Sequence, residues 1–488
     1  MGIYECQLNI SFAYTFGGVV CNNNFMNSLG YWILDVRMIM NKDELVSHGN
    51  VKGREVALKI IEYALESVDS YKATLRLVNV DDDTLKVGGS KYDLARVNRI
   101  FVVGAGKATY PIAKALEEIL EDRLSGGLII VKRGDGRRLN RIQVVEASHP
   151  LPDEAGLEGA RRIVKIAEGA QFRDLVFCAI TGGASALTPL PAGDITLEDK
   201  RVVTDLLLKS GAKIDEVNAV RNHISKIKGG RLAHYIHPAQ IINLIVIDEV
   251  AGQPWGPTVP DQTTFQDAFK TLKKYGLWDK VPNTVRGYIE RGLRDPRLET
   301  PKTKDFDGLK VQNVILADNE ILCEAAERKA RDLGFKPMIL STVVEGESRE
   351  VGSVLATIGK EVDVKGRPLK PPCVLIAGGE STVKVEGESG LGGPSQELVL
   401  GASLRIGGCG RIVVASIDTD GTDGPTDVAG GIADGYTVSR AEGEGIDIFD
   451  SLTKHNSYEV LRRLKDTIVT GPTGTNVMDL NLIVVTRK

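Results

Sequence analysis

The chain has 488 residues, of which 42% are hydrophobic and 26% charged, and its formal net charge is −4. This composition is typical of a soluble globular protein, and the length suggests several domains of about 150 residues each. The acidic balance argues against a broad nucleic-acid surface. No apolar run reaches the roughly 18 residues of a membrane helix, so neither nucleic acid nor a membrane is an expected partner.

Cysteine usage and the N-terminal residues bear on compartment and processing. The six cysteines are scattered and form no CxxC pair, which indicates reduced thiols and a cytoplasmic protein rather than a disulfide framework. Residues 1–40 are an atypical extension, because residues 1–37 carry almost no charge and show no clear periodicity. We interpret this stretch as a translation-start artefact or a dispensable extension.

From residue 51 onwards, helices and buried strands alternate along the chain. Apolar residues recur at helical spacing over 51–65, which predicts an amphipathic helix. Apolar runs separated by helical segments then predict strands at 99–104, 126–131, 174–180 and 241–247. This alternation is typical of an α/β architecture with a mostly parallel sheet.

A charged, proline-bearing stretch at 294–308 has no apolar period and predicts a linker. The alternation of strands and helices restarts after it, so we expect two tandem α/β domains. The first is predicted to span residues 41–300 and to be Rossmann-like with a mostly parallel sheet. The second is predicted to span residues 301–488 and to be a smaller mixed sheet with helices.

Polar, glycine-rich clusters follow four of the predicted strands. In open parallel sheets, ligands bind beyond the carboxyl ends of the strands, so a cleft between the two domains is the expected site. The four clusters are GAGK at 104–107, TGGAS at 181–185, GGE at 378–380 and DTDGTDG at 418–424.

The two clusters of the first domain predict anion binding. VGAGKAT, at 103–109, joins a strand to a helix, where backbone N–H groups and a lysine attract anions. It lacks the spacing of a Walker A loop, and it lacks the third glycine and the following acidic residue of a dinucleotide fingerprint. TGGASAL, at 181–187, is a second such turn, and it lacks the last glycine of a nucleophile elbow. The candidate binding residues are Gly104, Gly106, Lys107, Thr181, Gly182, Gly183 and Ser185.

A basic run, VRNHISKIKGGRL, carries Arg221, Lys226, Lys228 and Arg231. Such a run commonly forms a solvated helix face. Alternatively, Gly229 and Gly230 end a helix whose basic face points into the cleft.

The second domain supplies the acidic candidates. In DTDGTDG, Thr422 and Asp423 occupy positions at which an EF-hand needs an acid and a glycine, so a calcium loop is excluded. Mg²⁺ instead takes one or two carboxylates together with waters and substrate phosphates. The candidate metal ligands are Asp418, Asp420, Asp423 and Glu380, and the candidate substrate or phosphate contacts are Gln396 and Asn476.

Basic turns on one domain and acidic loops on the other indicate a metal–nucleotide phosphotransferase. Over residues 45–486 the chain also resembles the MOFRL-type glycerate kinases, the glycerate 2-kinase group. The motifs that carry this resemblance are VGAGKA, EASHPLPDEAG, TGGASAL, VRNHISKIKGGRLA, GPTVPD, GGESTVKV, GGPSQE, DTDGTDGPTDVAGG and TGPTGTNVMDL.

The resemblance implies two α/β domains, the second MOFRL-like, with a cleft between them. It implies ATP- and Mg²⁺-dependent phosphorylation of D-glycerate to 2-phosphoglycerate, with ATP as the phosphoryl donor. Lys107 would lie near the glycerate carboxylate or the transferred phosphate, and Ser185 would belong to the phosphate nest. Asp418, Asp420 and Asp423 would lie in the metal and substrate region, with Lys107, Asp418 and Asp420 catalytic and an aspartate of this loop as general base.

One departure of the chain from the family pattern removes a positive charge. The usual GGRNQE reads GGPSQE here, with Pro394 and Ser395 in place of Arg-Asn. We expect Arg221 or Lys226 to supply the missing positive charge. Two alternative functions remain open, an NAD(P)-dependent hydroxypyruvate reductase and a nucleotide-sensing protein without activity. Association into a homo-oligomer also remains open.

Overall fold

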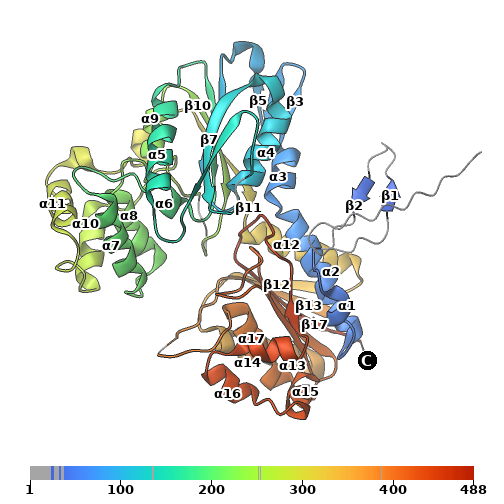
Figure 1. Cartoon of the computed structure of the whole chain (residues 1–488). Coiled ribbons are helices and arrows are strands. Elements are labelled where there is room, and N and C mark those ends of the chain that lie inside the picture. The colour runs from blue at the N-terminus through green and yellow to red at the C-terminus, as the bar shows by residue number, and fades with distance from the viewer. Residues whose placement is uncertain are drawn as a thin grey trace, which may run out of the picture.

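The structure is a computed structural model, and it describes residues 24–26, 32–34, 38–134, 137–250, 252, 254–385 and 387–487. Most of the predicted extension, residues 1–40, lies outside the described residues. Two α/β domains lie one above the other in Figure 1, and a helical lobe projects from the upper one. No helix among the described residues is both long and apolar enough to cross a bilayer.

The first domain is built on a six-stranded sheet in which every strand pair is parallel. Its strand order is β11-β10-β9-β6-β7-β8. Because β6 comes first in the chain, the order reverses between β6 and β9, and this is the switch point at which such sheets bind ligands. The strands are β6 (Ile100–Ala105), β7 (Leu124–Lys132), β8 (Ile142–Ala147), β9 (Leu175–Ile180), β10 (Gln240–Val246) and β11 (Val311–Ala317).

Both faces of this sheet are covered, which explains why its strands are continuous apolar runs. Successive residues of β9 alternate between two separate hydrophobic clusters, one on each face. One face packs on α3 (Ser70–Leu77), α4 (Thr109–Leu120) and a small antiparallel sheet of β3 (Val78–Asp81), β4 (Thr84–Val87) and β5 (Ser90–Asp93). The other packs on α5 (Glu154–Glu168), α6 (Ala184–Leu187) and α9 (Arg231–Ile236).

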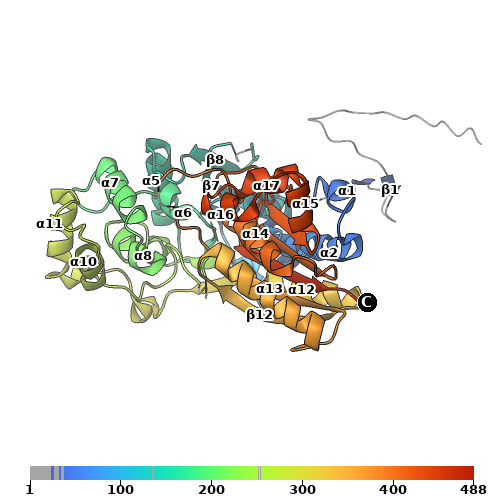
Figure 2. The same cartoon turned by 90° about the horizontal axis from the view of Figure 1, so that it is seen from below.

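The helical lobe has a hydrophobic core of its own, which includes Phe265, Leu272 and Ile289. Helix α7 begins after its N-cap Thr196, which forms a reciprocal capping box with Asp199. Figure 2 shows the lobe to one side of both domains. Its helices are α7 (Leu197–Leu208), α8 (Ile214–His223), α10 (Phe265–Lys274) and α11 (Asn283–Gly292).

The second domain is a mixed sheet with the order β12-β13-β17-β14-β15-β16. Only β12 and β13 are parallel, and the other pairs are antiparallel. The last strand of the chain, β17, lies between β13 and β14, so the carboxyl ends of β13 and β14 meet the start of β17 at one edge. The strands are β12 (Lys336–Val344), β13 (Cys373–Gly379), β14 (Ile412–Asp418), β15 (Gly430–Asp434), β16 (Thr467–Ile468) and β17 (Asp479–Val485).

Helices cover both faces of the second sheet as well. Helices α2 (Val51–Ser67) and α12 (Asn319–Asp332) pack on one face. Helices α13 (Ser348–Lys365) and α14 (Pro394–Ile406) pack on the other. The remaining short elements are α1 (Lys42–Leu45), α15 (Thr437–Gly443), α16 (Ile448–Thr453), α17 (Ser457–Arg463) and the antiparallel pair β1 (Asn24–Met26) and β2 (Trp32–Leu34).

The predicted fold class, two α/β domains with a Rossmann-like first sheet and a mixed second sheet, is confirmed. The predicted domain boundaries differ from the structure. Strand β11 lies beyond residue 301, yet it pairs with β10 in the first sheet. Helix α2 lies after residue 41, yet it packs on α12, β14 and β17 of the second domain. From α2 onwards, the chain therefore runs from the second domain to the first between α2 and α3, and it returns after β11.

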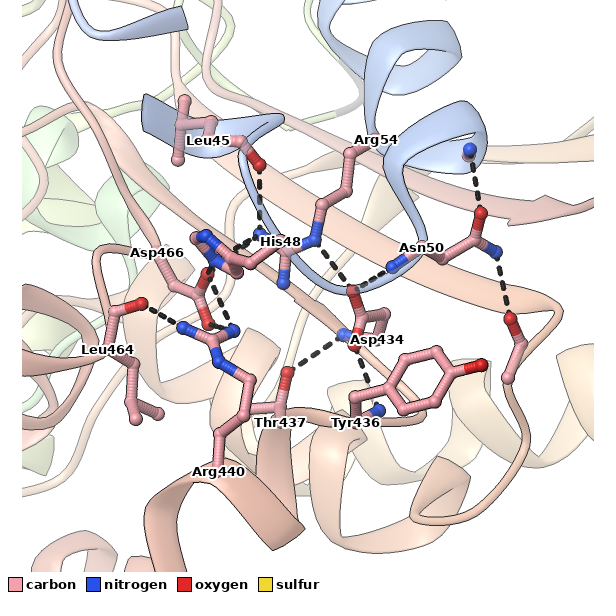
Figure 3. Close-up of polar contacts among 12 residues, drawn as sticks. Leu45, His48, Asn50, Arg54, Asp434, Tyr436, Thr437, Arg440, Leu464 and Asp466 are labelled. Atoms are coloured by element: carbon pink, nitrogen blue, oxygen red, sulfur yellow. Dashed lines mark hydrogen bonds and ion pairs between the residues drawn. The ribbon is translucent and has the colours of Figure 1, made fainter. Parts of the chain in front are cut away.

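A buried ion network fastens the N-terminal helices to the second domain (Figure 3). Arg54 of α2 is fully buried, and its Nε donates to Asp434 Oδ2 over 2.6 Å. Its NH1 group donates to Asp466 Oδ1 over 2.7 Å, and Arg440 donates to the other oxygen of Asp466 over 3.0 Å. His48 Nε2 lies 2.8 Å from Asp466 Oδ1. Two arginines thus neutralise two buried aspartates.

The network holds both charge types in their ionised forms. Burial alone would raise the pKa of Asp466, but the hydrogen bond from His48 and the charge of Arg54 outweigh it and lower the pKa. Burial alone would lower the pKa of Arg54, and Asp466 and Asp434 raise it. Removing one partner would leave a buried charge without compensation, which costs much more than the intact pair contributes.

We expect Arg54→Met to lower the free energy of unfolding by about 3–5 kcal/mol, because it leaves Asp434 and Asp466 buried without their shared cation. Urea unfolding followed by circular dichroism measures this change. Arg76→Met is the matched control on α3, where the arginine is exposed, and it should stay within about 0.5 kcal/mol of the parent. Equal effects of the two substitutions would contradict the role of Arg54.

Candidate functional site

Two turns at the switch point of the first sheet are hydrogen-bonded to each other. The turn after β6 contributes the N–H of Lys107, which donates to the carbonyl oxygen of Gly182 over 2.8 Å. The turn after β9 contributes Thr181, whose N–H donates to the carbonyl oxygen of Ala105 over 3.1 Å and whose Oγ1 accepts from the N–H of Ala108 over 3.0 Å. These bonds fix the backbone from which the Lys107 side chain projects.

Gly104 and Gly106 allow this close approach of the two turns. A Cβ on Gly104 would lie 2.3 Å from the carbonyl oxygen of Ala179, and one on Gly106 would lie 2.0 Å from Thr181 Oγ1. Gly106 also has a φ of +141°, which favours glycine. Because the N–H groups of Gly106, Lys107 and Ala108 all donate within the protein, the predicted anion nest is reduced here to the side chain of Lys107.

The TGGAS turn faces both the first domain and the second. A Cβ on Gly182 would lie 2.1 Å from Asp248 Oδ2 and 3.4 Å from Asn476 Nδ2, so the loop before β17 reaches this turn. Gly183 begins α6 with a φ of +85°, and its missing Cβ leaves room for His149 and for the Lys107 side chain. The predicted residues Gly182, Gly183 and Asn476 therefore come together.

Three acidic residues converge at one edge of the second sheet. Asp418 at the end of β14 pairs in register with Asp479 at the start of β17. Asp479 also pairs with Gly379, the last residue of β13, and Glu380 follows directly. Asp479 is buried, Asp418 is partly buried and Glu380 is exposed. The strand register therefore places Asp418 beside Asp479, and Glu380 follows the end of the neighbouring strand.

An ion pair joins the two domains at this point. Lys107 Nζ of the first domain lies 3.2 Å from Asp420 Oδ2 of the second, and both side chains are largely buried. The other oxygen of Asp420 accepts from the N–H of Thr422 over 2.8 Å and from its hydroxyl over 2.7 Å. The N–H of Asp420 donates to Asp418 Oδ1 over 3.0 Å. The predicted residues Lys107, Asp418 and Asp420 thus form one contiguous group.

Hydrogen bonds between two loops hold the acidic loop against the start of β17. The Thr419 hydroxyl donates to the carbonyl oxygen of Met478 over 2.7 Å and accepts from the N–H of Val477 over 2.8 Å. The Thr473 hydroxyl donates to the carbonyl oxygen of Thr419 over 2.5 Å. The motifs at 418–424 and 470–480 therefore form two loops that are hydrogen-bonded to each other.

Charge is unbalanced around Lys107. Burial alone would lower its pKa, but the carboxylates of Asp420, Asp418 and Asp248 outweigh burial and raise it. Burial and the neighbouring Asp420 raise the pKa of Asp418 well above its usual range, and burial with the charge of Asp418 does the same for Asp479. Burial raises the pKa of Asp248 to about 7, with repulsion from Glu249 adding to it. These carboxylates lack the positive charge that would stabilise their ionised forms.

This imbalance fits a divalent cation. Asp248 Oδ1 is buried and has no hydrogen-bond partner among the described residues. No group of three acidic, histidine or cysteine side chains of the described chain is arranged as a metal cluster. Mg²⁺ needs fewer protein ligands than that, because waters and substrate phosphates complete its octahedron, and it prefers oxygen donors. The residues present therefore fit a magnesium ion that is bound together with a phosphate substrate.

Asp423 and Gln396 lie in a different environment from Asp418. Asp423 is buried and accepts the N–H of Ser395 over 3.0 Å and the N–H of Gln396 over 2.9 Å, at the start of α14. Gln396 Nε2 also donates to Asp423 Oδ2 over 2.8 Å. Both Asp423 oxygens thus cap the helix, so the structure accounts for Asp423 without a metal.

The basic run divides into buried and exposed residues. Lys226 is exposed. Arg221, in the last turn of α8, lines a small cavity with Ser185, Lys200 and Lys228. Of the two cations expected to replace the missing arginine, only Arg221 thus lies beside the TGGAS turn.

The sequence patterns do not single out Asp479, Lys200 or His149 as candidate site residues. Asp479 begins a strand that reads as an ordinary terminal β-strand, and its role depends on that strand lying between β13 and β14. Lys200 sits in an amphipathic helix among other charges. His149 lies beside Gly183, and burial together with the charges of Lys107, Lys132 and Arg221 lowers its pKa to about 4. The motif EASHPLPDEAG was the available signal for His149.

Family models match both domains. Residues 56–290 match a domain of unknown function, DUF4147, and residues 373–479 match the MOFRL family. The chain is 45% identical over 440 residues to a glycerate 2-kinase from Pyrococcus horikoshii. This alignment covers 89% of this chain and 98% of that protein.

A solved structure and a further relative extend the comparison. The crystal structure of glycerate kinase from Thermotoga maritima matches with a TM-score of 0.77 and 35% identity, over 88% of this chain and 99% of that one. A putative hydroxypyruvate reductase from Agrobacterium vitis is 38% identical over 392 residues, 79% of this chain and 87% of that protein.

Proposed function

Because this chain belongs to the MOFRL-type glycerate kinase family, we propose that it transfers the γ-phosphoryl group of ATP to a hydroxyl group of D-glycerate. The chain is thus a phosphotransferase with an alcohol group as acceptor. We propose 2-phosphoglycerate as the product, Mg²⁺ as the metal and the space between the two domains as the site. The observation that carries this proposal is the surplus of carboxylates around Lys107, where the two domains face each other.

The charge pattern supports phosphoryl transfer in particular. This reaction depends on positioning and on neutralising negative charge, and it asks for little covalent chemistry from the protein. Lys107 is held on a hydrogen-bonded turn and is kept protonated by its acidic neighbours. It can therefore stabilise the charge that develops on the transferred phosphoryl group. A bound Mg²⁺ would supply further neutralisation of the phosphate oxygens.

We assign the metal to Asp418 and Asp420, with Glu380 and Asp479 close by. Asp418 is also our choice for the general base, because its carboxylate accepts from the N–H of Asp420, whose side chain is paired with Lys107. The turn at Thr181, Gly182, Gly183 and Ser185 would lie against the phosphates. Asn476 reaches this turn from the second domain and is placed to contact the same ligand.

A nicotinamide-dependent hydroxypyruvate reductase is the second candidate, because two of the relatives are described as putative hydroxypyruvate reductases. Two observations weigh against it. Strand β7, the second strand of the sheet, ends in Lys132 rather than in the acidic residue that binds a dinucleotide ribose. The N–H groups of Gly106, Lys107 and Ala108, at the turn that would hold the pyrophosphate, already donate within the protein.

A pair of assays on the purified protein tests the proposed function. We expect ADP release that depends on D-glycerate, ATP and Mg²⁺ and that stops with excess EDTA. We expect no NADH or NADPH oxidation with hydroxypyruvate. Coupling the product directly to enolase identifies 2-phosphoglycerate. Oxidation of NADH without ADP release would replace the kinase by the reductase, and silence in both assays would favour a sensor without activity.

The role of Asp418 has its own test. We expect Asp418→Asn to lower kcat by about 10²–10⁴-fold, because the amide cannot accept the hydroxyl proton and binds Mg²⁺ poorly. The control is Asp427→Asn in the same loop, where the carboxylate is exposed and accepts one hydrogen bond from Tyr458. Steady-state kinetics at saturating ATP should show little change in the control. Full turnover by Asp418→Asn would remove Asp418 from the mechanism.

A further inference from the structure

Three cationic side chains meet in a cavity on the first-domain side of the site. The cavity lies between the turn that begins α6 and helices α7 and α8 of the helical lobe. Lys200 and Lys228 are only 4% and 6% exposed, and Arg221 is partly buried. The residues that line the cavity include Ser185, Lys200, Thr204, Arg221, Ile224 and Lys228.

Backbone oxygens are the polar partners of the two lysines. Lys228 Nζ donates to the carbonyl oxygen of Ser185 over 2.6 Å, and Lys200 Nζ donates to the carbonyl oxygen of Ile224 over 3.2 Å. An ammonium group has three hydrogens to donate, so each lysine keeps unused donors. The guanidinium of Arg221 makes no hydrogen bond or ion pair with any residue that the structure describes.

No carboxylate among the residues that the structure describes is paired with the three cations. Burial lowers the pKa of Lys200 to about 7, with the charges of Arg221 and Arg231 adding to the effect. Burial also lowers the pKa of Lys228 well below its usual range, with Lys200 and Arg221 adding to it. Buried charges in proteins are normally paired. These three cations have no acidic partner, so we expect a bound anion to compensate them.

The size and position of the cavity indicate which anion it takes. It has room for about one water-sized group, which admits one oxygen of a carboxylate and excludes a triphosphate chain. Ser185 belongs to the same turn as Gly183, which contacts Lys107 and His149. Burial and the charges of both Lys107 and Arg221 lower the pKa of His149. The cavity therefore adjoins the proposed site of phosphoryl transfer.

We propose that the cavity lined by Lys200, Arg221 and Lys228 is the subsite that binds the carboxylate of the phosphoryl acceptor. The inference rests on the proposed function, and it extends that function to a set of cations separate from Lys107. The carboxylates at the edge of the second sheet repel an anionic acceptor, and the cations of the cavity in the first domain attract it. The hydroxyl group on the carbon next to the carboxylate is thereby directed toward Lys107, which is left to act on the phosphoryl group.

The substitution Lys200→Met tests the proposal without ATP. We expect calorimetry to show D-glycerate binding that is about 10- to 100-fold weaker than in the parent, because a charged hydrogen bond is lost. The ligand-free variant should melt at a higher temperature than the parent, because an apolar side chain replaces a buried, unpaired charge. The control is Lys209→Met at the end of the same helix, where an exposed lysine pairs with Asp205. It should change neither value.

Binding of different ligands shows whether the cavity binds a carboxylate or a phosphate. D-glycerate and glycolate should bind the parent protein, and glycerol, which has no carboxylate, should not. If inorganic phosphate binds in a Lys200-dependent manner and the two carboxylates do not, the cavity is a phosphate site and the proposal is wrong. Binding of D-glycerate that Lys200→Met leaves unchanged would also overturn it.

The same experiment distinguishes failure of the inference from failure of the proposed function. Lys200-dependent binding of D-glycerate without ADP release in the presence of ATP and Mg²⁺ would remove the kinase activity and keep the subsite. ADP release with an unchanged KM for D-glycerate in Lys200→Met would keep the kinase activity and remove the subsite. In the outcome that we expect, the variant has a raised KM for D-glycerate and an unchanged KM for ATP.

Discussion

The ion pair between Lys107 and Asp420 joins the two domains at the point where their charge patterns meet. On one side, the reversal of strand order between β6 and β9 puts a lysine at a turn that is fixed by backbone hydrogen bonds. On the other, the position of β17 between β13 and β14 gathers Glu380, Asp418 and Asp479. One lysine cannot neutralise so many carboxylates, and this imbalance is what a metal–phosphate ligand would relieve.

The Arg54 network provides an internal comparison for this interpretation. There, Asp434 and Asp466 are fully buried, and Arg54 and Arg440 compensate them. In this network, two arginines therefore compensate two buried acids. By contrast, the edge of the second sheet has more carboxylates than cations. The cavity in the first domain has cations and no carboxylate among the described residues. Uncompensated charge of this kind concentrates at functional sites.

Local patterns in the sequence predict much of this site. The apolar runs locate the strands, and the glycine-rich clusters at their ends locate Lys107, Gly182, Gly183, Asp418 and Asp420, which the fold then brings together. Sheet membership is not a local property. Strand β11 follows the predicted linker and reads like the first strand of a new domain, yet it completes the first sheet. Helix α2 precedes the first sheet in the chain and packs on the second.

Burial and hydrogen bonding decide the roles that the sequence leaves open. Asp423 belongs to the same acidic loop as Asp418, and only its contacts with the start of α14 identify it as a cap. Lys226 and Lys228 are two residues apart in one basic run, and one is exposed while the other is buried against Ser185. Asp479 lies at the candidate site only because β17 is placed between β13 and β14. These distinctions depend on long-range packing, which single-sequence patterns do not contain.

The central claim is that residues of the two domains act on one substrate complex, and a double-mutant cycle tests it most directly. The measured quantity is kcat/KM for Lys107→Met, for Asp420→Asn and for the double variant, relative to the parent protein. If both residues act in one site, the two losses should not add, and the coupling energy should be at least about 1 kcal/mol. Losses that add to within about 0.5 kcal/mol would place Lys107 and Asp420 in independent sites and contradict the account.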